Sequence, residues 1–179
     1  MEAPIKTITT MITRLTTETI IMIRVAALVA ALAVSLPMLA LPALAQTVEA
    51  CDWRASAQSL VEPWDAPENT RTFANGDVRL AVTDVIEPAA GAFHLVILSP
   101  PYDELGGRQC QIVSANGSVG FTGLTLGGMT SAYDPAIGLT FTIEAGAYDP
   151  NTGGTLPRTL TVTLNQATGA ITANVQGGK

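Results

Sequence analysis

Two stretches in the last third of the chain decide the fold class: residues 139–143 are Leu-Thr-Phe-Thr-Ile, and residues 160–164 are Leu-Thr-Val-Thr-Leu. In both stretches an apolar side chain alternates with a threonine. Successive side chains of a β-strand point to opposite faces of a sheet, so this alternation predicts strands with one buried and one solvent-exposed face. Thr168-Gly169 then predicts a turn into a further strand over residues 170–175.

Strand patterns continue toward the N-terminus. Residues 70–74 and 77–85 flank Asn75-Gly76 and predict a β-hairpin, because both central residues of a tight hairpin turn take positive φ. Residues 92–99 (AFHLVILS) are apolar at nearly every position, which predicts a central strand that is covered on both faces.

A second hairpin is predicted across Asn116-Gly117, from residues 109–115 to residues 118–126. The mature chain then contains about eight short strands with turn signals between them. This spacing predicts a mainly β fold, either an antiparallel β-sandwich or a small barrel. The pattern by itself does not separate these two architectures.

One segment near the start of this β region has the period of a helix. Asp52 is a suitable N-cap, and Pro63 ends the segment. The apolar residues that recur at the spacing of one helical face are Trp53, Ala57, Leu60 and Val61. The sequence therefore predicts one short N-terminal helix that caps one end of the β domain.

Residues 22–45 (MIRVAALVAALAVSLPMLALPALA) are typical of a bacterial secretory signal peptide. A basic start at Arg24 precedes an apolar run, and residues 43–45 have the small-x-small pattern that precedes cleavage. Two prolines interrupt the run, whereas a retained membrane helix needs about 20 continuous apolar residues. We therefore expect cleavage near Ala45 and no membrane span in the mature chain.

Three regions follow from this interpretation. Residues 1–21 lack a core pattern, and a start at Met22 would give a signal of ordinary length, so the first region is interpreted as an overlong N-terminal extension. Residues 22–45 are the signal peptide. Residues 46–179 have the size of one domain and form a single mature β domain, which we expect in the periplasm or outside the cell.

The charge of the chain indicates which classes of partner it can bind. The chain has 9 Lys and Arg against 15 Asp and Glu, with a net charge of −6, so it is a poor partner for nucleic acid or anionic lipid. The expected partners are a small molecule, a glycan or an envelope protein.

Cys51 and Cys110 are the two cysteines, and in an oxidising compartment an even count predicts one disulfide bond.

The loop over residues 99–108 (SPPYDELGGR) is the main candidate for a ligand-binding site, because long loops on a rigid scaffold often carry binding residues. The Tyr102 ring could stack on a ligand, and the Arg108 guanidinium could bind a carboxylate with two hydrogen bonds. Asp103 and Glu104 complete the candidate set. The alternative is a stiff connection in which prolines extend the loop and glycines turn it.

A calcium site is the one cofactor hypothesis. Asp149 and Asn151 belong to a D-x-N-x-G sequence, which resembles the start of a calcium-binding loop. The downstream glutamate of such loops is missing. The same Tyr-Asp-Pro sequence occurs at residues 133–135 and 148–150, where Asp and Pro are also good turn formers, so two similar turns are the alternative.

No catalytic set is evident. His94 is the single histidine and lies within the predicted central strand, and the sequence has no Gly-x-Ser-x-Gly motif to supply a nucleophile. We therefore expect an exported, non-catalytic binding or interaction domain of unknown ligand. Two alternatives stay open: a small secreted hydrolase that uses carboxylates such as Asp103 or Glu104, and a structural envelope protein that pairs through a sheet edge.

Overall fold

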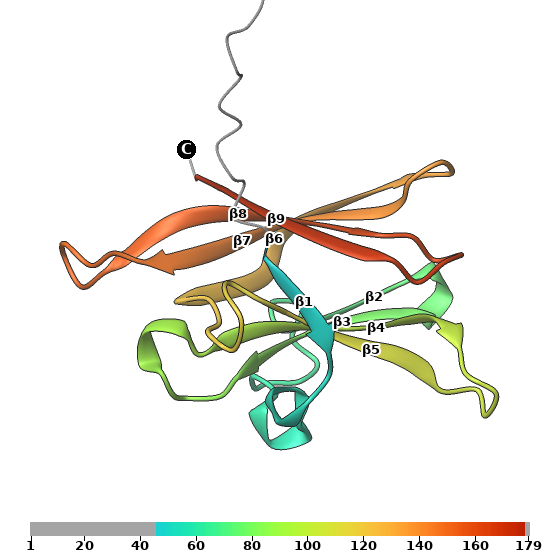
Figure 1. The fold of residues 1–179 in the computed structure, drawn as a ribbon, viewed down its shortest axis with the longest axis horizontal. Helices are drawn as coiled ribbons and strands as arrows, with labels where there is room; N and C mark the ends of the chain where they lie inside the picture. The colour runs from blue at the N-terminus through green and yellow to red at the C-terminus, as the bar shows by residue number, and fades with distance from the viewer. Residues whose placement is uncertain (1–45, 178–179) are drawn as a thin grey trace, which may run out of the picture. The chain divides into compact units, whose positions relative to one another are not determined.

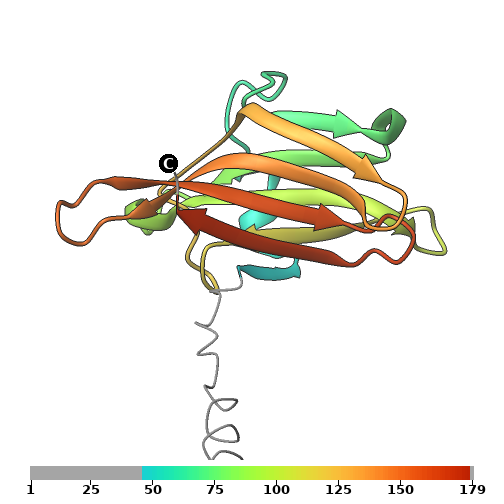
Figure 2. The ribbon, with the colours of Figure 1, turned by 90° about the horizontal axis from the view of Figure 1, so that it is seen from above.

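The computed structural model describes residues 46–177, which form two antiparallel sheets packed face to face (Figure 1, Figure 2). One sheet has the strand order β1-β5-β4-β3-β2, and the other has the order β6-β7-β8-β9. Because the two sheets are separate, the fold is a β-sandwich and not a closed barrel. The expected extension (1–21) and signal peptide (22–45) lie outside the described residues. No helix within residues 46–177 is long and apolar enough to cross a membrane.

The described part has nine strands, one more than the eight or so expected. The strands are β1 (Thr47–Ala50), β2 (Thr70–Phe73), β3 (Val78–Asp84), β4 (Phe93–Tyr102), β5 (Arg108–Ser114), β6 (Gly123–Asp134), β7 (Gly138–Tyr148), β8 (Thr155–Leu164) and β9 (Ile171–Gly177). Four short 3-10 turns complete the secondary structure, namely η1 (Trp53–Ala55), η2 (Ala57–Ser59), η3 (Ala74–Gly76) and η4 (Ala89–Gly91).

The alternating stretches form the strands that their period predicts. In the β7–β8 ladder Phe141 lies opposite Val162 on the inner face, and Thr142 lies opposite Thr161 on the outer face. Phe141 and Val162 are fully buried, as expected for the apolar positions. The β2–β3 hairpin across Asn75-Gly76 is also confirmed, with Phe73 paired to Val78.

The core lies between the two sheets. It is built from the inward-facing apolar side chains of both sheets, chiefly Val78, Leu80, Val82, Leu95, Ile97, Val113, Phe121, Leu126, Phe141, Ile143, Leu160, Val162 and Leu164. Burial of a side chain of this size stabilises the fold by roughly 1.5–3 kcal/mol, so this double layer supplies most of the driving force for folding.

Strand β4 is the middle strand of its sheet and is covered on both faces, as its composition predicts. Leu95 and Ile97 point into the core. Val96 pairs with Ile112 on the opposite, outer face, and both are nevertheless buried. Their cover is the segment of residues 51–69, which connects β1 to β2 and passes over the outer face of the five-stranded sheet (Figure 1).

The expected N-terminal helix does not form, and the prediction is wrong. The segment instead contains the two 3-10 turns η1 and η2 and then becomes extended, with Leu60 bridged to Thr83 and the Val61 amide donating to the Val82 carbonyl. Trp53, expected on the buried helical face, is 64% exposed, whereas Arg54 is 3% exposed. Pairing with β3 and burial of Arg54 therefore replace the helical face.

The hairpin expected across Asn116-Gly117 is also wrong. Only Asn116 and Val119 bridge each other there, and the chain then crosses from β5 to the other sheet to begin β6. Both edges of β5 are already occupied, by β4 and by the four-residue strand β1. This short strand is the one that the sequence pattern missed.

The predicted disulfide between Cys51 and Cys110 is confirmed, with a Cα–Cα distance of 5.3 Å. Strand β1 explains the pairing, because its ladder places Ala50 opposite Gln111 and the Cys51 amide donates to the Cys110 carbonyl at 3.1 Å. The bond fastens the start of the covering segment to β5.

Candidate functional site

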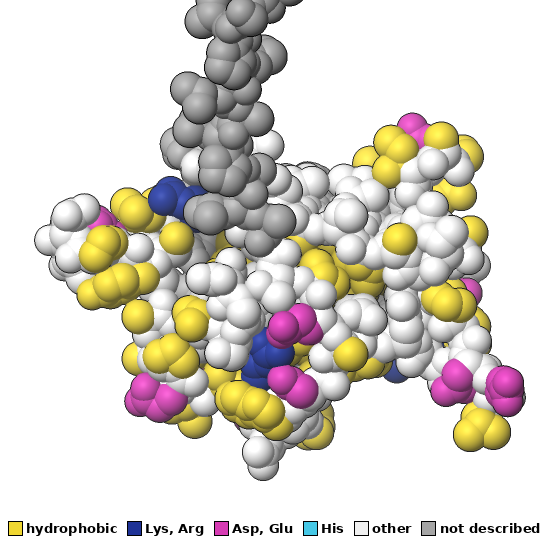
Figure 3. Space-filling view, viewed as in Figure 1, with side chains coloured by type: hydrophobic (Ala, Val, Ile, Leu, Met, Phe, Trp, Pro, Cys, Tyr) yellow, Lys and Arg dark blue, Asp and Glu magenta, His cyan; other side chains and the backbone are white. Residues whose placement is uncertain are grey.

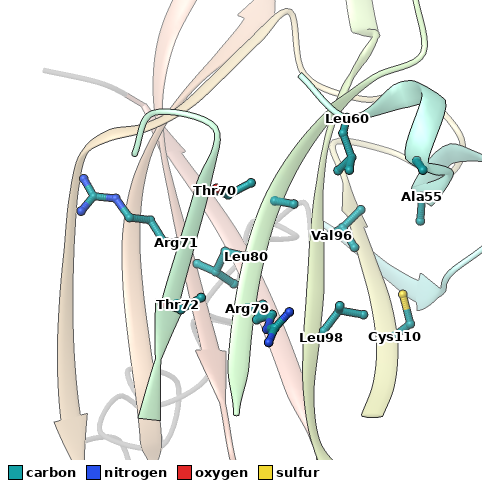
Figure 4. Close-up of a pocket in the computed structure, with 12 residues that line it drawn as sticks. Ala55, Leu60, Thr70, Arg71, Thr72, Arg79, Leu80, Val96, Leu98 and Cys110 are labelled. Carbon is teal, nitrogen blue, oxygen red and sulfur yellow. The ribbon is translucent and has the colours of Figure 1, made fainter. Parts of the chain in front are cut away.

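A pocket of about 430 Å³ lies on the outer face of the five-stranded sheet, beside the covering segment (Figure 4). Its lining residues are Ala55, Ala57, Leu60, Thr70, Arg71, Thr72, Arg79, Leu80, Ala81, Val96, Leu98 and Cys110. They come from β2, β3, β4, β5 and the segment of residues 51–69. Sequence regions far apart in the chain therefore meet at one hollow.

Two neighbouring rows of the sheet form the floor of the pocket. In one row Thr70, Ala81 and Val96 lie side by side on adjacent strands. In the next row the cross-strand neighbours are Thr72, Arg79, Leu98 and Cys110. Small or apolar side chains occupy the centre of the first row, whereas Arg79 and Leu98 stand side by side at the centre of the second. The floor is thus apolar apart from Arg79 and the threonines on β2.

The covering segment supplies one wall of the pocket. Ala55 and Ala57 belong to the two 3-10 turns, and Leu60 follows them. Small side chains at Ala55, Ala57 and Ala81 leave room above the sheet that larger ones would fill. The Cys51–Cys110 disulfide fixes this wall at its N-terminal end, which makes the pocket a largely preformed site.

Tyr102 and Arg108, two of the predicted binding residues, connect the β4–β5 hairpin to the turn between β2 and β3 at one end of the five-stranded sheet. The Tyr102 hydroxyl donates to Asp77 Oδ1 at 2.7 Å, and this bond raises the pKa of Tyr102. Arg108 donates from Nε to the Asp77 carbonyl at 3.0 Å and from Nη2 to the Gly76 carbonyl at 3.2 Å. The Arg108 guanidinium also lies 5.7 Å from the centre of the Tyr102 ring, within cation–π range.

The two carboxylates of the predicted set lie at the tip of the β4–β5 hairpin. Asp103 Oδ1 accepts hydrogen bonds from the Leu105 and Gly107 amides at 2.9 and 2.7 Å, so it stabilises its own turn. Glu104 is exposed beside it. Neither residue lines the pocket, and the structure therefore does not bring Tyr102, Asp103, Glu104 and Arg108 together around a common hollow.

The candidate calcium residues lie in the β7–β8 turn. The Asp149 carboxylate accepts from the Asn151 amide nitrogen at 2.9 Å and from the Thr152 hydroxyl at 2.8 Å, and these bonds hold the pKa of Asp149 below its usual range. The related turn at Asp134 lies at the other end of β7. Within residues 46–177 no group of three or more His, Cys, Asp or Glu is arranged to hold a metal ion.

A buried polar cluster anchors the covering segment to the sheet next to the pocket. Arg54 Nη2 makes ion pairs with Glu49 at 2.7 Å and with Asp52 at 2.9 Å. Its Nη1 donates to the Ser114 hydroxyl at 3.0 Å, and that hydroxyl also contacts His94 Nδ1 at 2.9 Å. The hydrogen bonds with Asp52 raise the pKa of Arg54 and lower that of Asp52.

His94 is fully buried in this cluster. Burial, reinforced by the nearby Arg54 charge, lowers the pKa of His94 to about 4, while Asp52 acts in the opposite direction. Its Nε2 atom and the Thr83 hydroxyl have no hydrogen-bond partner within residues 46–177. Ser114 and His94 are both inaccessible to solvent, so they form a structural pair and not a nucleophile with its base.

This environment predicts an acid-sensitive fold. Because the pKa of His94 falls from 6.5 to about 4 on folding, the unfolded chain binds more protons between these pH values and stability decreases as the pH falls. The expected loss from this residue between pH 7 and pH 4 is about 3 kcal/mol. Urea denaturation at both pH values measures it, and His94→Gln should reduce the pH dependence by that amount. An unchanged pH dependence in the variant would contradict the assignment.

No protein-family model, curated protein or solved structure gives a significant match to this chain. Function must therefore be inferred from the site. The pocket was missed by the sequence interpretation, because its residues are spread over five segments and include no conspicuous motif. The one local signal was the pair of alanines at positions 55 and 57. The helical spacing of this segment led instead to the prediction of a helix.

Proposed function

We propose that this chain is an exported, non-catalytic binding domain whose ligand occupies the pocket beside the covering segment. The observation that carries the proposal is the apolar hollow itself. The outer face of a sandwich sheet is ordinarily exposed and polar, whereas here β3 and β4 present Ala81, Val96 and Leu98 to a space of about 430 Å³. Small-molecule sites have volumes of about 300–1,000 Å³ and similar apolar linings.

The composition of the pocket favours a small molecule with an apolar body. Its lining contains no aromatic ring, so it offers no stacking platform for a sugar. It contains no carboxylate either, and Asp103 and Glu104 lie at the hairpin tip, so nothing at this site supports the hydrolase alternative. Export is supported by the disulfide, since such bonds persist in oxidising compartments.

Filling the pocket tests the proposal. Ala81→Phe places a large ring over the pocket floor at a strand position that accepts aromatic residues. Ala132→Phe is the matched control, because Ala132 is exposed on β6 in the other sheet. We expect the neutral probe 4-phenylbutan-1-ol to bind the oxidised protein weakly and Ala81→Phe to reduce its affinity at least tenfold.

The measurement is titration by two-dimensional NMR, which detects weak binding and locates it. Shifts in the amides of Val96, Leu98 and Ala55 would support the site, and Ala132→Phe should bind like the unmodified protein. Equal affinity of Ala81→Phe and the unmodified protein, or shifts confined to other residues, would overturn the proposal.

A further inference from the structure

We infer that the pocket selects a ligand with a carboxylate beside its apolar body, and that Arg79 holds this carboxylate. The inference rests on the proposed function, because it names the chemical class that the same pocket would take. It depends on where Arg79 lies, on how little the rest of the structure uses its guanidinium, and on the polar groups next to it.

Arg79 lies on the floor of the pocket with its side chain exposed. It stands on β3 between Thr72 of β2 and Leu98 of β4, and Figure 4 shows its side chain leaning toward Leu98. Its one hydrogen bond within residues 46–177 is a long contact of 3.4 Å from Nε to the Gly76 carbonyl. Both terminal nitrogens therefore remain available, and no carboxylate of the described part pairs with them.

The other arginines near this face are already engaged. Arg54 is buried between two carboxylates. Arg71 also lines the pocket, but it donates to the Pro67 carbonyl at 2.8 Å and to the Leu126 carbonyl at 3.3 Å, and Figure 4 shows its guanidinium turned away from the pocket. Arg79 is thus the cation of the pocket lining that is free to meet a ligand.

A second positive charge lies close to Arg79. The Gly76 carbonyl accepts from Arg79 Nε and also from Arg108 Nη2, so the two guanidinium groups approach the same oxygen. The Asp77 carboxylate nearby is bonded to the Tyr102 hydroxyl. Two guanidinium groups against this one carboxylate give this end of the pocket a local excess of positive charge, in a chain with a net charge of −6 whose acidic side chains are prominent on the surface shown in Figure 3.

The chemistry of a guanidinium group favours a carboxylate as the ligand group that it binds. A guanidinium binds a carboxylate with two parallel hydrogen bonds, and a ligand whose apolar body lies on the pocket floor would hold its carboxylate beside Arg79. The Thr72 hydroxyl, on the same row of the sheet, makes no side-chain hydrogen bond within the described residues and can donate to the same oxygen atoms. The apolar body would then lie over Ala81, Val96 and Leu98.

Three probes with the same carbon skeleton test the inference with the oxidised protein: 4-phenylbutyrate, 4-phenylbutan-1-ol and 4-phenylbutylamine. We expect the carboxylate to bind about fivefold more tightly than the alcohol, as for an ion pair with an exposed arginine, and the amine to bind most weakly. Arg79→Gln should remove the preference for the carboxylate, measured as the ratio of the carboxylate and alcohol affinities within the variant. Arg79→Lys should keep part of it, since the charge remains without the planar fork. Arg158→Gln, on the other sheet, is the control.

The outcomes separate the two proposals. Equal binding of all three probes in the pocket would overturn the carboxylate preference and leave the binding domain intact. A preference that persists in Arg79→Gln would overturn the role of Arg79. If none of the probes shifts the amides of the pocket, the proposed function itself fails. Loss of the preference in Arg79→Gln alone, with Arg158→Gln unchanged, supports the inference.

Discussion

Replacing Cys51 and Cys110 together by serine is expected to lower the free energy of unfolding by about 4 kcal/mol. The disulfide closes a loop with a sequence separation of 59, and opening it restores conformational entropy to the unfolded chain. For a domain of this size the loss corresponds to a decrease in Tm on the order of 15 °C. Urea and thermal denaturation of the oxidised protein and the double variant measure both quantities.

The same change should weaken ligand binding, because the disulfide fastens the wall of the pocket. Without it, the segment that carries Ala55 and Ala57 is still held by the Arg54 cluster and by the pairing of Leu60 and Val61 with β3, but its N-terminal end loses its covalent link to β5. We expect the double variant to bind 4-phenylbutan-1-ol more weakly than the oxidised protein at a temperature where both are folded. A Tm within a few degrees of the oxidised protein would contradict the expected stabilisation.

Gly138→Ala is expected to destabilise the fold by on the order of 4 kcal/mol or more, enough to prevent folding of a marginal domain. Gly138 has φ +113°, which side chains other than glycine rarely adopt. A Cβ atom there would lie 2.2 Å from the Leu164 carbonyl oxygen. This oxygen belongs to the backbone of β8, where Leu164 is paired with β7 on one side and with β9 on the other.

Gly153→Ala is the matched control, because Gly153 occupies the equivalent position in the second Tyr-Asp-Pro turn. It also has a positive φ, of +71°, but no atom lies within 4 Å of the added Cβ. We expect a loss of about 1–2 kcal/mol, the usual strain of this backbone region. Urea denaturation compares the two variants, and equal destabilisation would show that the contact with β8 does not matter.

The strands with a clear period of two are those that the sequence predicts well. Residues 139–143 and 160–164 form parts of β7 and β8 with the expected buried and exposed faces. The hairpin across Asn75-Gly76 forms because its signal is local, but its connection is longer than the expected two-residue turn: it spans residues 74–77, and Ala74 takes a positive φ together with Asn75 and Gly76. The disulfide was predictable from cysteine count and expected compartment.

The two predictions that are wrong, the N-terminal helix and the hairpin at Asn116-Gly117, have the same physical cause. The helical spacing from Trp53 to Val61 is real, but the segment gains more by pairing with β3 and by burying Arg54 against Ser114. The hairpin at Asn116-Gly117 does not form because β1 already occupies the edge of β5. Each local pattern is overridden by a contact with a residue far away in the sequence.

The candidate site shows the same limit. The sequence interpretation favoured the loop of residues 99–108, where Tyr102 and Arg108 prove to tie that loop to Gly76 and Asp77. The pocket instead depends on small and apolar residues from five segments, and none of these is unusual by itself. Arg79 looks like an ordinary exposed strand residue until the tertiary structure places it beside Leu98 on the floor of the pocket.

The sequence by itself therefore determined the β class, most strands, two of the turns and the cysteine pair, because alternation and turn chemistry depend on neighbouring residues. Only the tertiary structure decided that β1 completes the five-stranded sheet and that residues 51–69 cover its outer face. Strand partners are chosen by which edges remain free and by how much apolar surface the pairing buries. Those quantities exist only once distant segments have come together, and the pocket arises at the place where they meet.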